Sequence, residues 1–132
     1  MSTIKIALAV MSLSFIMASG LSLGSTSVLA QQAGVSLVKD VSIVKNAATM
    51  PTKAFSPNPV DIKVGGGVTW TNDDSQIHTV TSGTVGSNNS GSVFDSKILS
   101  PGATFDFVFD KAGQYDYYCT LHPQMVGKVI VS

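Results

Sequence analysis

The segment from Ala103 to Asp110 is the most regular pattern in the chain. Its phenylalanines fall on one face of an extended strand and the residues between them fall on the other, Phe105, Phe107 and Phe109 against Asp106, Val108 and Asp110. Side chains of a strand point alternately to its two faces. A period of two over this length predicts a β-strand with one buried face and argues against an amphipathic helix.

Shorter extended segments recur along the chain. We expect a first strand or two within residues 35–44, and further strands at 60–64, 68–72, 78–82, 114–119 and 126–131. Turn residues separate these segments, and no 11-residue window has a convincing helical period. Seven to eight short strands predict an all-β sandwich with Greek-key connections. The inner faces of its sheets are expected to hold Trp70, Phe105, Phe107, Phe109, Tyr115, Tyr117, Val129 and Val131.

Two longer stretches are expected to be irregular. Proline cannot donate to a strand ladder, so a central strand is excluded from residues 46–59 by Pro51, Pro57 and Pro59. Residues 83–92 are rich in Gly, Ser and Asn and indicate a polar loop. Asn88 opens an Asn-x-Ser glycosylation pattern within this loop. An unmodified flexible loop is the alternative interpretation of the same residues.

Residues 1–30 have the pattern of an export signal. Lys5 is their only charge, an apolar run follows from Ile6 to Met17, and Val28-Leu29-Ala30 is similar to a cleavage site. We therefore expect an exported protein, periplasmic or extracellular, whose mature chain is one domain over residues 31–132. The alternative is a retained membrane anchor, because the uncharged stretch is long enough to span a bilayer.

The charged residues are of only two kinds. The chain has eight Lys and eight Asp, with no Arg and no Glu, so its formal net charge is zero. Arginine is the residue best suited to bidentate phosphate contacts, and a nucleic-acid-binding domain carries a basic surface. The composition therefore argues against a nucleic-acid partner.

Cys119, His122 and Met125 lie within seven residues, spaced Cys-x2-His-x2-Met. Cys119 is the only cysteine, and His78 is the only other histidine. Period two puts Cys119 on the same strand face as Tyr117, so the sulfur is expected to point into the sandwich. Two His and one Cys with a weak axial Met suit a copper electron-transfer site.

Each of these residues alone has an ordinary structural explanation. A single cysteine is more often a small buried hydrophobe than a ligand, and a lone histidine or methionine is more often part of the core. Zinc would accept the thiolate and imidazoles, but thioether is not among its usual ligands. A Cys–His hydrolase would need an exposed nucleophile and an oriented base. The combination on a β frame favours copper, and the protein is not expected to be an enzyme.

The sequence resembles the blue copper proteins, the cupredoxins of the plastocyanin and amicyanin type, over about residues 35–132. The resemblance implies a soluble one-electron carrier with His78, Cys119, His122 and Met125 as copper ligands. The short Cys-to-Met spacing and the proline after His122 are similar to amicyanin. The likeness rests on Phe55-Ser56-Pro57, Val68 to Asp74, His78-Thr79-Val80, Phe94-Asp95-Ser96, Tyr115 to Met125, and Gly127-Lys128-Val129.

The resemblance also implies how electrons enter and leave. The outer edge of the His122 imidazole is expected at the surface, surrounded by the apolar residues Leu121, Pro123 and Val126. A redox partner is expected to dock there transiently, and the protein is expected to be a monomer. Tyr118 is either a second electron exit or an ordinary exposed strand tyrosine. Thr79 stands where several family members have Asn, and its hydroxyl is expected to reach a backbone group near Cys119.

Two other functions use the same residues. The protein could hold or deliver copper without redox turnover, with the same four ligands. An adhesive β-sandwich with an incidental thiol is the third possibility. Unchanged metal binding after His78→Ala would support the adhesive sandwich.

Overall fold

The computed structural model describes residues 37–132, so the expected export signal at 1–30 lies outside the described residues. Within 37–132 no helix is long and apolar enough to cross a membrane. This part of the chain forms eight strands and one short 3-10 helix, η3. Their bounds are β2 Val38–Ile43, η3 Ala47–Thr49, β3 Phe55–Ser56, β4 Val60–Ile62, β5 Gly67–Asn72, β6 Thr81–Ser82, β7 Thr104–Val108, β8 Gly113–Tyr118 and β9 Val126–Val131.

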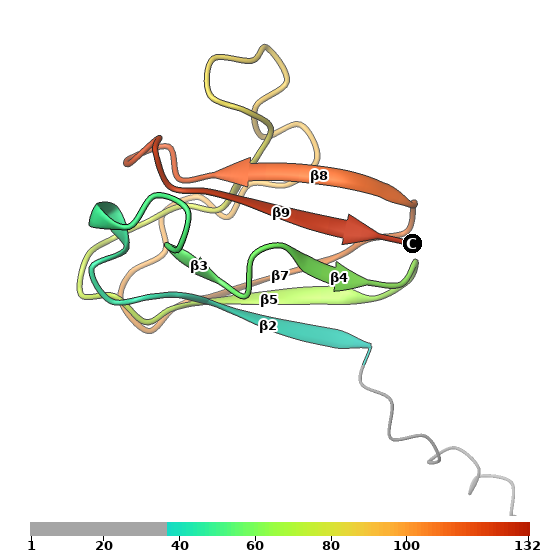
Figure 1. Ribbon diagram of the computed structural model, residues 1–132, viewed down its shortest axis with the longest axis horizontal. Coiled ribbons are helices and arrows are strands. Elements are labelled where there is room, and N and C mark those ends of the chain that lie inside the picture. Colours follow the sequence, from blue (N-terminus) through green and yellow to red (C-terminus); the bar gives the residue numbers. More distant parts are fainter. Residues whose placement is uncertain (1–36) are drawn as a thin grey trace, which may run out of the picture. The chain divides into compact units, whose positions relative to one another are not determined.

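The strands form two four-stranded sheets that pack as a sandwich (Figure 1). One sheet has the order β3-β2-β5-β7 and the other β4-β9-β8-β6. β2 runs parallel to β5, and β4 runs parallel to β9, whereas the other pairs are antiparallel. Neighbours in each sheet are mostly distant in sequence, so the chain crosses repeatedly between the sheets. The expected all-β, Greek-key sandwich is confirmed.

The strand bounds differ from the sequence pattern where the backbone makes other contacts. β9 has the predicted bounds, and the first strand region contains one strand, β2. β7 ends before Phe109, because the Phe109 N–H donates to Gly66 O and its carbonyl accepts from Gly65 N. The proline-rich stretch, residues 46–59, holds η3 and a single strand, β3, which has two residues and lies at a sheet edge, where prolines are tolerated.

Trp70, in the middle of β5, lies at the centre of the core and is fully buried. Its ring centroid is 5.4 Å from that of Tyr117, 5.5 Å from Phe94 and 5.7 Å from Phe105. The expected inner-face residues all belong to this core. Five of them are buried, namely Trp70, Phe109, Tyr117, Val129 and Val131. The other three are partly exposed and pack against the buried core, namely Phe105, Phe107 and Tyr115.

The β8–β9 hairpin carries the segment on which the sequence placed most of the ligands. Its strands pair from Gly113 opposite Val131 to Tyr118 opposite Val126. Tyr117 lies opposite Gly127, and its ring occupies the space that a side chain at position 127 would need. Burial raises the pKa of the Tyr117 hydroxyl. The packing of Tyr117 therefore fixes the hairpin at the base of the loop that follows.

Candidate metal centre

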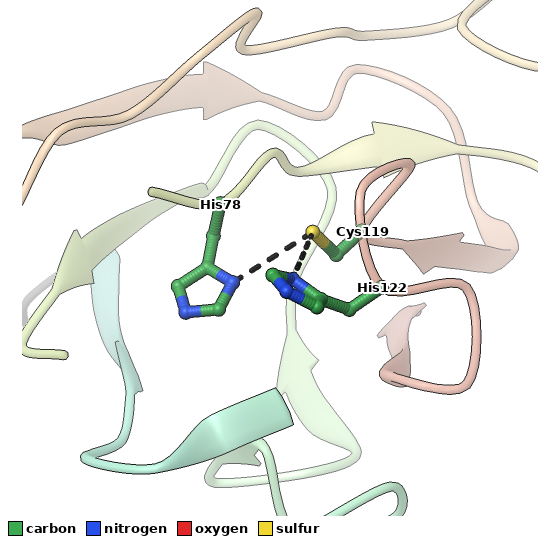
Figure 2. A group of neighbouring side chains, drawn as sticks. All are labelled: His78, Cys119 and His122. Atoms are coloured by element: carbon green, nitrogen blue, oxygen red, sulfur yellow. Dashed lines mark hydrogen bonds between the residues drawn. The ribbon is translucent and has the colours of Figure 1, made fainter. Parts of the chain in front are cut away.

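Three donor side chains converge beside the loop that joins β8 to β9. The ligand atoms of His78, Cys119 and His122 all lie within 4.8 Å of one another (Figure 2). Cys119 Sγ is 3.8 Å from His78 Nδ1 and 3.7 Å from His122 Nδ1. Both imidazoles thus present Nδ1 to the sulfur, and the three side chains predicted to share a site lie together.

Cys119 follows β8 directly, and the loop behind it closes on itself. The Cys119 N–H donates to Met125 O at 3.1 Å, the His122 N–H to Cys119 O at 3.2 Å, and the Met125 N–H to His122 O at 2.9 Å. Cys119 and Met125 are both fully buried. Three of the four predicted ligands therefore belong to one hydrogen-bonded turn, grouped with His78.

His78 comes from the segment between β5 and β6. Its backbone pairs with Leu99 through bonds of 3.2 and 2.8 Å, and its ring is fully buried. His78 Nε2 lies 2.8 Å from Asp74 Oδ2. A carboxylate accepts a hydrogen bond from Nε2–H, and in this tautomer the lone pair of Nδ1 faces Cys119.

Asp74 was not among the site residues predicted from the sequence. Its other oxygen, Oδ1, accepts the N–H of Asn46 at 2.9 Å and of Ser75 at 2.8 Å. Burial raises the pKa of Asp74, but the hydrogen bonds from His78, Asn46 and Ser75 lower it more, to about 2. The carboxylate is therefore a fixed negative charge beside His78. The sequence places an aspartate, Asp74, four residues before His78, but this spacing indicates a contact only once the conformation of the intervening turn is known.

Thr79 connects the His78 segment to the Cys119 segment. Its N–H donates to Cys119 Sγ at 3.3 Å, and its Oγ1 accepts the Thr120 N–H at 2.8 Å. The second bond is the contact that the sequence led us to expect from the threonine hydroxyl. Together the two bonds place the sulfur and the start of the loop against the strand that bears His78.

Tyr118 and His122 differ in their access to solvent. Tyr118 is only 8% exposed, and its hydroxyl lies 2.6 Å from that of Ser90 in the loop after β6. The interpretation of Tyr118 as an ordinary exposed strand tyrosine is therefore wrong, because this loop covers it. His122 is half-buried, and its apolar neighbours are exposed, namely Leu121, Pro123 and Val126.

The donor set fits copper better than zinc. A thiolate, two imidazoles and a nearby thioether are the ligands of copper electron-transfer sites, whereas structural zinc sites use four strong donors.

A family model of copper binding proteins, the plastocyanin/azurin family, matches residues 41–132. The chain belongs to this family. The family binds one copper ion, and the structure groups His78, Cys119, His122 and Met125 as a ligand site. The resemblance inferred from the sequence is thus confirmed.

Relatives of known identity agree with this family assignment. The chain is 35% identical to chloroplastic plastocyanin of Tetradesmus obliquus, with 78% of this chain and 80% of that protein covered. It is 33% identical to amicyanin of Paracoccus denitrificans, with 71% and 68% covered. Among solved structures, a purple cupredoxin from Nitrosopumilus maritimus is 38% identical, with a TM-score of 0.65, covering 71% of this chain and 99% of that one.

Proposed function

We propose that this protein is a one-electron carrier and not an enzyme. Bound copper supplies the chemistry, a one-electron couple between Cu(I) and Cu(II). Cys119, His78 and His122 would be the strong ligands, and Met125 a weak fourth. The observation that carries the proposal is the convergence of the three ligand atoms within 4.8 Å. The carrier role of plastocyanin-like and amicyanin-like proteins supports it.

The residues around the site hold the ligands still, which favours fast electron transfer. Asp74 fixes the His78 ring, Thr79 N–H reaches the Cys119 sulfur, and the ligand loop is closed by its own backbone bonds. A ligand set that needs little rearrangement between two oxidation states lowers the cost of electron exchange. Burial of Cys119, His78 and Met125 also keeps water away from the donors.

We assign the electron exit to His122. It is the most accessible member of the site, and exposed Leu121, Pro123 and Val126 adjoin it in the chain. An apolar surface with few charges suits brief contacts with a redox protein. We propose a monomer that docks its partners there. Tyr118 is a second exit candidate, but its burial makes it the less accessible one.

We further propose that the protein is exported to the periplasm or the cell exterior. The support is the pattern of residues 1–30, with a retained membrane anchor as the alternative. N-terminal sequencing of the exported protein tests cleavage, which a mature chain beginning at Met1 would exclude.

An absorption spectrum is the first test of the copper site. Adding one equivalent of Cu(II) should give an intense visible thiolate-to-copper band, and Cys119→Ser should abolish it. Bound copper without this band would reject the proposed site. Met125→Leu should keep the band and raise the reduction potential. Met50→Leu is the matched control, because Met50 lies at the surface, and should leave the potential unchanged.

Electron self-exchange separates the carrier from a copper-holding or copper-delivery protein with the same ligands. Rapid self-exchange in the copper-loaded protein, with slow release of Cu(I) to a chelator, is expected of a carrier. Slow self-exchange with fast transfer of copper to an acceptor would instead establish delivery. Full burial of Cys119 and His78 favours the first result, because an incoming acceptor ligand cannot reach them directly.

A further inference from the structure

The two histidines of the site are held in different ways. His122 belongs to the ligand loop and is half-buried, whereas His78 is fully buried with its outer nitrogen 2.8 Å from the Asp74 carboxylate. The contact joins the nitrogen that faces away from Cys119, while Nδ1 faces the sulfur. Carboxylates bonded to the outer nitrogen of a metal-binding histidine fix its tautomer and make it a stronger donor.

We propose that Asp74 is a positioning residue that tunes the copper site through His78. It holds the proton on Nε2, directs Nδ1 toward the metal, and through its negative charge favours Cu(II) over Cu(I). The protein should therefore have a lower reduction potential, and bind Cu(II) more tightly, than it would without this carboxylate. The inference rests on the proposed role of His78 as a ligand.

Asp74 is itself held in one orientation. Both of its oxygens are used, Oδ2 by His78 and Oδ1 by the N–H groups of Asn46 and Ser75. The Asp74 N–H donates to Asn72 Oδ1 at 3.0 Å. The contact with His78 is therefore part of a fixed turn and not a chance approach of two mobile side chains.

Fully buried Asn72 ties this turn to the strand bridge at His78. Its amide nitrogen donates to Gln76 O at 2.7 Å and to Leu99 O at 2.9 Å. Leu99 is the residue that pairs with the His78 backbone. Asn72 thus holds both the turn that carries Asp74 and the backbone that pairs with His78. The hydrogen bond between the carboxylate and the imidazole therefore has a defined geometry.

Asparagine cannot reproduce these contacts. The NH2 group of its amide would face either the Nε2–H of His78 or the N–H groups of Asn46 and Ser75. In either orientation a donor would face another donor, and a hydrogen bond would be lost. Asp74→Asn should lower the Cu(II) affinity about 10- to 100-fold, the usual effect of losing such a partner. If the loss falls on Cu(II) alone, each tenfold change raises the potential by about 59 mV. An unchanged affinity and potential would overturn the proposal.

Asp73→Asn is the matched control. Asp73 is the neighbouring residue, is exposed, and bonds to Ser42 instead of to a histidine, so the substitution removes the same charge without touching His78. It should change the potential much less than Asp74→Asn. Equal shifts would overturn the proposal, since charge alone would then explain them. Asp74→Glu should recover part of the affinity, because a surface pocket of about 300 Å³ adjoins Asp74.

A measurement on the unmodified, metal-free protein keeps the proposal testable if the variants fail to fold. The imidazole nitrogen shifts in an NMR spectrum should show His78 protonated at Nε2 and bare at Nδ1. A proton on Nδ1 would overturn the proposal. His78→Ala separates this failure from a failure of the proposed function. If it leaves the visible band intact, His78 is not a ligand. If it abolishes the band while Asp74→Asn has no effect, only the role of Asp74 is refuted.

Discussion

Replacing Gly127 by alanine tests whether the packing of Tyr117 holds the ligand loop. Gly127 lies directly opposite Tyr117 in the β8–β9 pairing. A Cβ at position 127 would lie 2.3 Å from Tyr117 Cζ, 2.5 Å from its hydroxyl oxygen and 2.7 Å from Cε2. Carbon atoms in contact need about 3.5 Å, so the ring would have to move by about 1.2 Å.

The Tyr117 ring has little room for such a shift. It is 1% exposed, with ring centroids of Phe55 at 4.8 Å and Trp70 at 5.4 Å. Overpacking a filled core costs about 1–3 kcal/mol, and the tight surroundings place Gly127→Ala in the upper half, about 2–3 kcal/mol. For a domain of this size the melting temperature should fall by about 10–20 °C.

Chemical denaturation of the copper-free protein measures this cost, because bound copper would add its own binding energy to the stability. The control is the same substitution in a Tyr117→Leu background, where the smaller side chain leaves space for the new methyl group. There Gly127→Ala should cost under about 0.5 kcal/mol, so the two changes should be strongly coupled. A cost that is equal in both backgrounds would refute the packing argument.

Three further outcomes follow from the site. Thr79→Val removes the hydroxyl that accepts the Thr120 N–H and should cost about 1–3 kcal/mol in denaturation, whereas Thr79→Ser should retain most of the stability. Asn72→Ala removes the hydrogen bonds that organise the turn before His78 and should cost at least about 2 kcal/mol; an unweakened visible band would show that the site does not depend on this turn. Copper at about 100 times its dissociation constant should stabilise the protein by about 2.7 kcal/mol, and thermal melts of Cys119→Ser should show a much smaller gain.

The ligand residues could be predicted from the sequence because the chain has so few candidates. One cysteine and two histidines leave a single set, and the strand period turns Cys119 toward the core. The fold class was equally accessible, since alternation in β7 and turn residues between segments are local signals. The parallel pairing of β2 with β5 has no such local signal, because it depends on which distant strands become neighbours.

The contacts that orient the ligands were beyond the sequence pattern. Asp74 reaches His78 through a turn that the Asn72 side chain closes, whereas an extended strand would hold the two residues apart. Tyr118 was expected at the surface in one interpretation, because its face of β8 is opposite to that of Cys119. The polar loop at residues 83–92 folds over it, and the Ser90 hydroxyl in this loop contacts the Tyr118 hydroxyl. Such coverage depends on tertiary contacts that periodicity does not encode.

The parallel pairing of β2 and β5 has a practical consequence for electrochemistry. β5 runs toward Asp74 and His78, and β2 is parallel to it, so β2 begins at the end of the sandwich opposite the copper site. β9 leaves the ligand loop and also ends there (Figure 1). A six-residue strand spans about 20 Å, so Leu37 and Ser132 both lie well away from His122. A linker attached at Leu37 or at Ser132 would hold the protein on an electrode or a scaffold with the copper site turned outward, free to meet a partner in solution.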